Sequence, residues 1–255
     1  MKIDLAHWVE SLKASNAFIL AGIVLILLSS IITITKAAGI LIKWYQRTIG
    51  YKRGFRRKID KLSADTNIEY FRSVLGSPAF INQQDGMIEY IFVLGKLAYV
   101  QALTNDHGRV LAYSVTTRTH KFNPSITLGP YTLDGRPIIV SLGKTRFHEL
   151  DTLNTPEGIV CFVGAHNYYY SERYYFGNPG NYQDYCFSQN QSGEINEYSP
   201  MLRQEEVSID HPEIKAFRQC GVINTFTVTS PLMDKKLDTL TLGPTYDQVR
   251  VARAL

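Results

Sequence analysis

The sequence contains only three cysteines among its 255 residues, Cys161, Cys186 and Cys220. An odd number of cysteines without regular spacing argues against the disulfide framework of small secreted domains, and free thiols are typical of a reducing compartment. The chain also lacks the GxxxxGK[ST] and GxGxxG phosphate loops, the GxSxG nucleophile elbow and the HExxH zinc motif. These absences favour a protein that is not an enzyme and uses no cofactor.

Two chemical alternatives would use the few cysteines. Cys161, Cys186 and Cys220 with His166 could form a zinc site, and His166 with Cys161 or Cys186 could activate a thiol. The spacing matches no known zinc ribbon or finger, and Cys161 lies in the apolar run IVCFVG, where cysteine behaves as a small hydrophobe. We therefore predict no metal site and no catalytic residue.

Acidic residues are almost absent from residues 36–61, which hold nine Lys or Arg against Asp60 alone. Residues 62–255 hold 16 basic and 20 acidic side chains, so this larger part is a poor nucleic-acid binder. The basic segment can contact anionic lipid headgroups, only set membrane topology, or bind nucleic acid, which is the unlikely interpretation. The side chains expected at lipid headgroups are Lys43, Arg47, Lys52, Arg53, Arg56, Arg57 and Lys58.

Residues 17–35, AFILAGIVLILLSSIITIT, carry no charge. As a helix they would reach roughly 28 Å, close to the thickness of a bilayer's hydrocarbon core. We predict a tail at 1–16, a transmembrane helix at 17–36 and a basic juxtamembrane helix at 37–61. A cleaved signal peptide is the alternative, although the balanced charge of the first sixteen residues argues against it. The Lys and Arg excess after the span predicts an outside N-terminus and a cytoplasmic C-terminal domain.

Two parts of the remaining chain share a pattern. YFRSVLGSP at 70–78 aligns with SERYYFGNP at 171–179, and NDHGRVLAYS at 105–114 aligns with NQSGEINEYS at 190–199. Between these anchors the second copy is sixteen residues shorter, about one strand and its turn. Residues 115–131 show a weaker similarity to residues 228–246, and both stretches contain Thr-Leu-Gly-Pro.

The first copy has clear local signals. A helix at 62–75 is predicted, with Asn67 as a cap and Gly76 and Pro78 at its end. Strands follow at 87–93, 96–104 and 109–117, with a hairpin turn at 105–108. By alignment, residues 168–176 should take the place of the helix, and 181–189 the place of the strand that ends at Thr104.

The stretch 168–187 has nine aromatic side chains in twenty residues. Three successive tyrosines on a helix point in three directions, so at least one faces solvent or a partner. Exposed aromatic patches usually mark interfaces, because tyrosine supplies contact area at a small entropic cost. The residues predicted to bind a partner protein are Tyr168, Tyr169, Tyr170, Tyr174, Tyr175, Tyr182 and Tyr185.

Residues 62–117 resemble the helix-plus-sheet unit of small bacterial outer-membrane assembly lipoproteins. The β-lactamase inhibitor protein is built from tandem copies of a similar unit. The motifs that carry the resemblance are NIE at 67–69, VLGSP at 74–78, EYIF at 89–92 and DHGRV at 106–110. Such units bind other proteins and catalyse nothing. Because no lipoprotein cysteine lies near the N-terminus, the resemblance does not imply a role in outer-membrane assembly. The whole chain resembles bacterial single-pass membrane-anchored proteins, which implies the inner membrane.

The expected fold is α+β: one transmembrane helix and a soluble domain of degenerate tandem helix and antiparallel-sheet units. Unit one is expected at 62–131, unit two at 145–206 and a C-terminal extension at 207–255. The expected function is a membrane-tethered, non-enzymatic protein-binding module acting as an adaptor, sensor or inhibitor. One alternative is a ligand-binding or enzymatic pocket near His166, Tyr170 and Cys186. Another is a defence or toxin effector that acts on the membrane.

Overall fold

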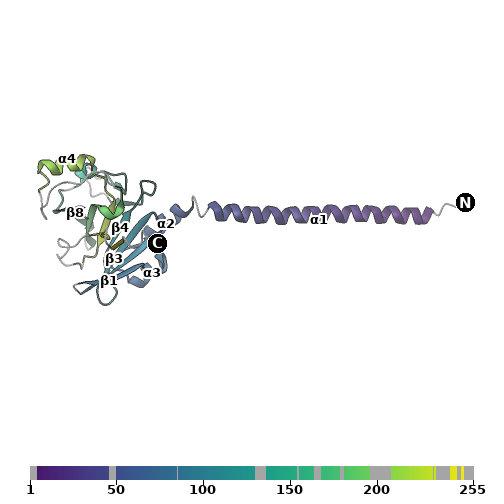
Figure 1. Ribbon diagram of the computed structural model, residues 1–255, viewed down its shortest axis with the longest axis horizontal. Helices are drawn as coiled ribbons and strands as arrows, with labels where there is room; N and C mark the ends of the chain where they lie inside the picture. Colours follow the sequence, from purple (N-terminus) through teal and green to yellow (C-terminus); the bar gives the residue numbers. More distant parts are fainter. Residues whose placement is uncertain are drawn as a thin grey trace. The chain divides into compact units, whose positions relative to one another are not determined.

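The computed structural model divides the chain into two compact units, Met1–Gly54 and Phe55–Leu255 (Figure 1). The residues that the structure describes are 5–45, 50–84, 86–129, 136–153, 155–163, 168–178, 181–195, 208–231, 233, 242–245 and 248–249.

The first unit consists mainly of the helix α1 (Leu5–Tyr45). Its stretch Ile19–Ile42 is long and apolar enough to cross a membrane. The hydroxyls inside this stretch bond back to the helix, as Ser30 Oγ does to the Ile26 carbonyl at 2.7 Å, so they leave no unsatisfied donor for a lipid environment. The helix contains the whole predicted span and fits a membrane anchor or a signal sequence. It also includes residues 5–16, predicted as a tail, and the short helix α2 (Tyr51–Ile59) lies within the predicted basic helix.

The second unit is built on an eight-stranded antiparallel sheet with the order β1-β2-β3-β4-β10-β9-β8-β7. Two four-stranded meanders therefore join through their last strands, β4 and β10, where Thr116 pairs with Thr225. Together with the helices described below, this sheet confirms the α+β class. The strands are β1 (Phe80–Gln84), β2 (Met87–Leu94), β3 (Ala98–Thr104), β4 (Val110–Thr117), β7 (Gly158–Val163), β8 (Tyr168–Asn178), β9 (Asn181–Asn190) and β10 (Thr225–Thr229).

The cap, the turns and the strands expected in the first half are confirmed, but the helix begins at Ile68 and residues 62–67, predicted as its first part, are not helical. The Asn67 side chain accepts a hydrogen bond from the Glu69 amide at 2.9 Å and so caps α3 (Ile68–Leu75). The helix ends at Gly76, whose φ is 97°. The hairpin between β3 and β4 turns at Gly108, whose φ of 74° favours glycine. The predicted strands at 87–93, 96–104 and 109–117 correspond to β2, β3 and β4.

Shorter elements complete the second unit. The 3₁₀ helices are η2 (Phe147–Thr152) and η3 (Gln191–Gly193), and the helix α4 (Pro212–Cys220) precedes β10. The strands β5 (Ser125–Leu128) and β6 (Ile138–Ser141) form a separate antiparallel pair.

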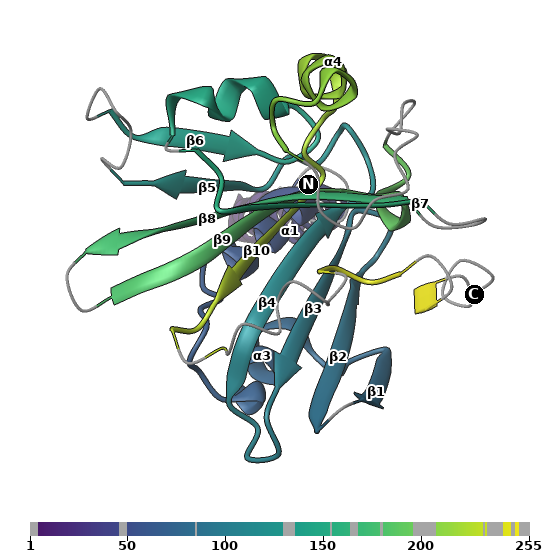
Figure 2. The same ribbon diagram turned by 90° about the vertical axis from the view of Figure 1, so that its left-hand side faces the viewer.

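Aromatic side chains fill one face of the large sheet, which we term the ring face; its members include Phe92, Tyr113, Tyr170, Tyr174 and Phe187. On the first half, Phe71 of α3 packs on Phe92 and Tyr113 at ring-centroid distances of 6.5 and 5.7 Å. On the second half, Phe147 of η2 and Phe217 of α4 pack on Tyr170 at 4.8 and 4.6 Å. The hydrophobic core therefore lies between the ring face and these helices, and Figure 2 shows α3 and α4 at different halves of the sheet.

The predicted helix at 168–176 is wrong, because these residues belong to strand β8. β8 pairs with β7 on one side and β9 on the other, so Tyr169 to Arg173 have strand partners on both sides. Tyrosine and phenylalanine favour strands, and Gly177 and Asn178 precede the turn into β9. The strand predicted at 181–189 is confirmed as β9.

The second meander is also complete, although the alignment predicted a missing strand. Its fourth strand, β10, lies within the range predicted as a C-terminal extension, after an insertion that contains α4. The element that precedes β7 is the six-residue η2, where the first meander has the eight-residue α3. The two halves therefore repeat the same strand topology, but the lengths of the segments between their strands differ.

Candidate functional site

Alternation along β8 sends the clustered tyrosines to opposite faces of the sheet. Tyr170, Glu172 and Tyr174 belong to the ring face, since their cross-strand neighbours include Phe187. Tyr169 and Tyr175 point to the other face. One strand therefore carries two different sets of aromatic side chains, and only the set that reaches solvent can meet a partner.

Tyr170 and Tyr174 are buried in a charged network beneath η2 and α4. Both hydroxyls donate to the Glu172 carboxylate, each at 2.6 Å. Arg218 Nε of α4 donates to the same carboxylate at 2.7 Å, and its guanidinium also bonds Asp151 and the Phe147 carbonyl. This network fixes η2 and α4 against β8.

Burial dominates the electrostatics of this network. It raises the pKa of Glu172, which is fully buried, while Arg218 and the two hydroxyls act in the opposite direction. Burial, followed by the Glu172 charge, also raises the pKa of Tyr170 and Tyr174 well above the ordinary tyrosine range. Because these hydroxyls stay protonated and occupied as donors to a buried carboxylate, their role is structural.

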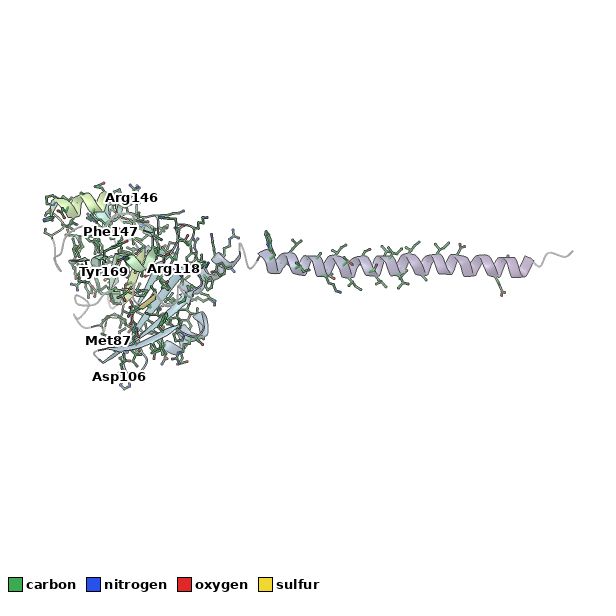
Figure 3. The ribbon with its side chains drawn as sticks, in the orientation of Figure 1. Met87, Asp106, Arg118, Arg146, Phe147 and Tyr169 are labelled. Carbon is green, nitrogen blue, oxygen red and sulfur yellow. The ribbon has the colours of Figure 1, made fainter. Side chains whose placement is uncertain are left out.

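Tyr169 is buried on the opposite face. Its hydroxyl accepts a hydrogen bond from the Leu242 amide at 3.3 Å and lies 3.2 Å from Ser188 Oγ. Burial raises the pKa of Tyr169 to about 12. Figure 3 marks its position within the domain. The prediction that Tyr169, Tyr170 and Tyr174 contact a partner is therefore corrected, because all three side chains are covered by the chain itself.

Two of the predicted residues, Tyr175 and Tyr182, are exposed, with 49% and 41% of their surface accessible. Their rings stack at a centroid distance of 5.5 Å and an angle of 23°. Behind them, on the ring face, Phe176 and Tyr185 stack at 4.6 Å and 9°. Tyr185 and Tyr168 are half-buried. We call Tyr175 and Tyr182 the hairpin pair.

The hairpin pair lies where β8 and β9 extend beyond their neighbours. β7 pairs with β8 only as far as Arg173, and β10 pairs with β9 only as far as Tyr185. Beyond these points, among the described strands, β8 and β9 pair only with each other (Figure 2). Beside the pair, Arg173 Nε lies 3.9 Å from Asp184 Oδ1. The sequence prediction missed these two charged residues, although both lie within the aromatic stretch.

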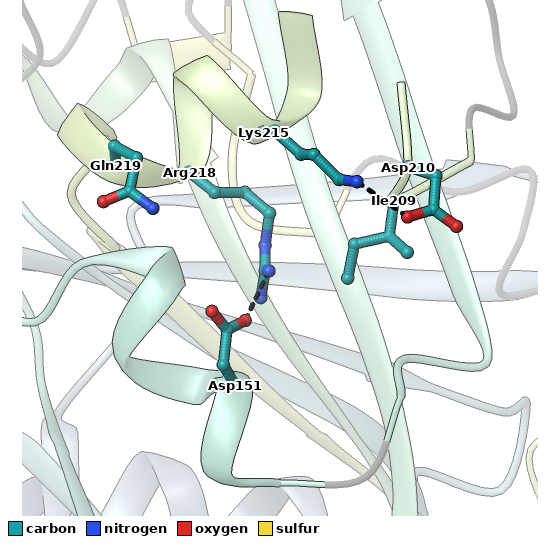
Figure 4. Close-up of a pocket in the computed structure, with 6 residues that line it drawn as sticks. All are labelled: Asp151, Ile209, Asp210, Lys215, Arg218 and Gln219. Atoms are coloured by element: carbon teal, nitrogen blue, oxygen red, sulfur yellow. Dashed lines mark hydrogen bonds and ion pairs between the residues drawn. The ribbon is translucent and has the colours of Figure 1, made fainter. Parts of the chain in front are cut away.

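A pocket of about 340 Å³ lies between η2 and α4 (Figure 4). Two lysine or arginine side chains line it, but each already has an acidic partner: Lys215 Nζ lies 2.9 Å from Asp210, and Arg218 bonds Asp151. Its charges are thus balanced within the pocket, which gives little attraction for a charged ligand.

The pocket expected near His166, Tyr170 and Cys186 is not formed by the last two residues. Cys186 on β9 pairs with Arg173 on β8. Arg173 and Tyr170 point to opposite faces of the sheet, so the Cys186 side chain is on the face away from Tyr170. His166 lies outside the described residues. The prediction that Tyr170 and Cys186 converge is therefore wrong, for the same reason of strand alternation.

The described cysteines are separated in the same way. Cys161 lies opposite Tyr170 and is buried on the ring face, Cys186 is buried on the other face, and Cys220 is exposed on α4. Burial raises the pKa of Cys161 to about 11, which leaves this thiol protonated and unreactive near neutral pH. Within the described part of the chain, no three His, Cys, Asp or Glu side chains gather as metal ligands.

Most of the basic residues predicted at lipid headgroups lie on α2. Arg56 Nη2 donates to the Asn123 carbonyl at 2.7 Å, and Lys58 Nζ lies 5.6 Å from the Phe55 ring centroid. Arg53 and Arg57 are exposed, and Lys52 is half-buried. Arg47 and the side chain of Lys43 lie outside the described residues. Lipid contact by this segment stays a prediction.

No protein-family model matches the chain, and no curated protein matches its sequence. A solved extracellular protein containing an SCP domain, from Bacillus anthracis, has a TM-score of 0.33 and 11% identity over 73% of this chain and 52% of that protein. A cysteine-rich secretory protein from Staphylococcus aureus has a TM-score of 0.31 and 12% identity over 66% and 44%. The chain thus spans about half the length of these two proteins, and likeness at this level supports no conclusion about function.

Proposed function

We propose that this chain is a membrane-anchored, non-enzymatic protein-binding module that contacts its partner through the hairpin pair. The observation that carries this proposal is the exposed stack of Tyr175 and Tyr182 on a hairpin that extends beyond the sheet. Stacked rings are ordered before a partner arrives, so their contact area is gained with little further loss of entropy.

The buried network supports this role, because it holds the base of the hairpin in place. Glu172 on β8 is bonded to Arg218 of α4, and Tyr174 lies one residue before the exposed Tyr175. A rigid scaffold that presents a few exposed aromatic residues is a common arrangement in binding proteins. Adaptor, sensor and inhibitor roles all fit this arrangement.

α1 anchors the module in a membrane, and the Lys and Arg excess after the apolar stretch orients the larger domain toward the cytoplasm. The basic side chains of α2 contact anionic headgroups in this arrangement. The three cysteines, all within the described residues, form no disulfide, which agrees with a reducing compartment.

The binding role is tested with the double variant Tyr175→Ala/Tyr182→Ala, purified through a C-terminal tag from native bacterial membranes. A photo-reactive amino acid at position 182 identifies the direct partner by crosslinking. We expect the double variant to recover at least tenfold less of that partner while its thermal unfolding stays close to wild type, because both side chains are exposed.

Phe162→Ala is the matched control, because Phe162 is equally exposed but lies on β7, away from the hairpin tip. This variant should recover the partner normally. Full recovery of the partner by the Tyr175/Tyr182 variant would refute the proposed surface.

The orientation is tested with a membrane-impermeant maleimide, which can reach the exposed Cys220 only from the compartment that contains the domain. We expect labelling after cell lysis but not in intact spheroplasts, and no labelling of Cys220→Ser in either sample. Rapid labelling in intact spheroplasts would place the domain outside and leave the hairpin test unaffected.

A further inference from the structure

The face of the sheet opposite the ring face contains many buried hydroxyl side chains beside apolar ones such as Ile91, Leu103 and Tyr169. We term it the hydroxyl face; it includes Ser114, Thr116, Ser171, Ser188, Thr225 and Thr227, all of them buried. Hydroxyls pair across strands, as Ser114 does with Thr227 at 2.7 Å and Thr116 with Thr225 at 2.9 Å. In an antiparallel sheet with one face on the core, a polar second face usually meets water. Here part of it meets the chain's own residues 242–244.

Residues 242–244, Leu-Gly-Pro, are held on this face by side chains that bond their backbone. Gln101 accepts from the Gly243 amide at 2.7 Å and donates to the Gly243 carbonyl at 3.3 Å. Asn190 Nδ2 donates to the Pro244 carbonyl at 3.2 Å and to the Leu242 carbonyl at 3.5 Å. With the Tyr169 hydroxyl, three side chains from three strands satisfy five backbone groups of three consecutive residues.

The same contacts define which sequence fits. The Leu242 side chain packs with Tyr169 and Cys186 in a small apolar cluster. Gly243 has a φ of 96°, and a Cβ there would lie 2.9 Å from Asn190 Nδ2 and 3.0 Å from Thr116 Oγ1. The position therefore requires glycine both for its backbone and for space. An aliphatic residue followed by glycine therefore fits this part of the face.

The lining also makes this site able to open. If residues 242–245 leave, the surface that meets water combines hydroxyl and carboxamide groups with Tyr169 and Cys186, while Phe92, Tyr170 and Phe187 stay covered on the ring face. Figure 2 shows the segment in yellow near β3 and β4. Its contacts with Gln101, Asn190 and Tyr169 come from side chains, as in the recognition of a bound peptide, and not from a ladder of paired strands.

We propose that the hydroxyl face is a peptide-binding site for an extended aliphatic-Gly-Pro segment, which residues 242–244 occupy in cis and a segment of a partner protein occupies in their place. The site uses Gln101, Asn190 and Tyr169 and does not depend on the hairpin pair. The cis segment regulates it by competition, because its attachment gives it a high effective concentration.

The test uses the full chain in detergent micelles with a protease site inserted after Thr239. The probe is a fluorescent peptide with the sequence of residues 241–249, TLGPTYDQV. After cleavage, we expect one peptide to bind per chain at least tenfold more tightly than to the uncut chain. Replacing the peptide's glycine by alanine, or Gln101→Ala in the protein, should each weaken binding at least tenfold. Gln83→Ala, an exposed glutamine on β1, is the matched control and should bind normally.

Three results would overturn the proposal. The cut chain could lose its fold or keep its original segment without exchange, and either result would make residues 242–245 part of the fold and not a ligand. It could also release the segment and fail to bind the probe, which would show that the hydroxyl face is not a peptide-binding site. An uncut Gly243→Ala variant gives a second measurement. It should bind the wild-type probe nearly as tightly as the cut chain does, and failure to bind would also contradict a displaceable segment.

Discussion

Both faces of the large sheet are buried over much of their area, but by different kinds of contact. The ring face packs aromatic side chains against α3, η2 and α4 and contains one buried ion pair. The hydroxyl face meets residues 242–244 through hydrogen bonds to backbone groups. The comparison shows that burial alone does not identify the contacts that stabilise a fold. The chemistry of the buried surface decides whether the segment packed on it can detach.

The magnitudes separate the two faces. Removing a buried aromatic ring from a core typically costs about 3–5 kcal/mol, because transfer and cavity terms add. A neutral hydrogen bond contributes only about 0.5–1.5 kcal/mol net, since water replaces the lost partner when the groups become exposed. We therefore expect the ring face to determine global stability and the hydroxyl face to determine local opening.

The largest expected effect comes from breaking the ion pair of the ring face. Arg218→Ala leaves the fully buried Glu172 without its charged partner, so we expect a loss of about 3–5 kcal/mol in the free energy of unfolding. Lys215→Ala is the matched control on the same helix, because its pair with Asp210 is exposed and worth less than about 1 kcal/mol. Chemical denaturation followed by near-UV circular dichroism measures both. Equal losses would mean that the buried pair does not stabilise this half of the sheet.

A smaller effect is expected from alkaline pH. Unfolded tyrosine ionises near pH 10, whereas burial raises the pKa of Tyr169 to about 12 and that of Tyr170 and Tyr174 further. Between these values the unfolded state has released protons that the folded state retains, so stability falls as the pH rises above about 10.

The Tyr169 share of this loss is about 3 kcal/mol at most, from a shift of roughly two units. Denaturation curves recorded between pH 9 and 12 give the free energy of unfolding at each pH. Tyr169→Phe should reduce its decline with pH in part, and Tyr170→Phe should reduce the decline up to pH 12. An unchanged slope in Tyr169→Phe would show that its hydroxyl ionises freely in the folded protein.

The smallest global effect is expected at Gly243. Gly243→Ala should release residues 242–245 from the hydroxyl face while lowering global stability by less than about 1 kcal/mol, because the face opens locally. Hydrogen exchange of the Gly243 amide, which is bonded to Gln101, should rise strongly.

Gly76→Ala provides the comparison for this change, since Gly76 has a similar φ of 97° but no atom near an added Cβ. It should strain the end of α3 by about 1–3 kcal/mol and leave the exchange of residues 242–245 unchanged. If Gly243→Ala instead unfolds the domain, the two faces are equally essential to the fold.

Local signals predicted the first half of the sheet well. Asn67 caps α3, and Gly76 and Gly108 adopt the positive φ that the sequence pattern predicts. Each of these features depends on residues close together in the chain. The secondary structure of the second half was predicted less well. The short motifs align across an insertion, and that alignment favoured a helix where the consecutive tyrosines prefer a strand.

The candidate site shows the same limit. The aromatic density of residues 168–187 marked the correct hairpin, and strand alternation would have separated Tyr174 from Tyr175. Which of these side chains reaches solvent depends on α4, because Phe217 and Arg218 cover the ring face, and Arg218 lies 46 residues beyond Glu172 in the sequence. No pattern near residue 172 contains that information.

The sequence by itself determined the apolar helix, the basic segment that follows it and the capped helix and hairpins of the first meander, because local composition and turn chemistry are sufficient for these. Only the tertiary structure decided that β10 joins the two meanders, that Glu172 meets Arg218, and that Gly243 lies on Gln101, which is 142 residues away. The physical reason is that buried polar groups require partners, and a partner can come from any part of the chain that the fold brings within hydrogen-bond distance.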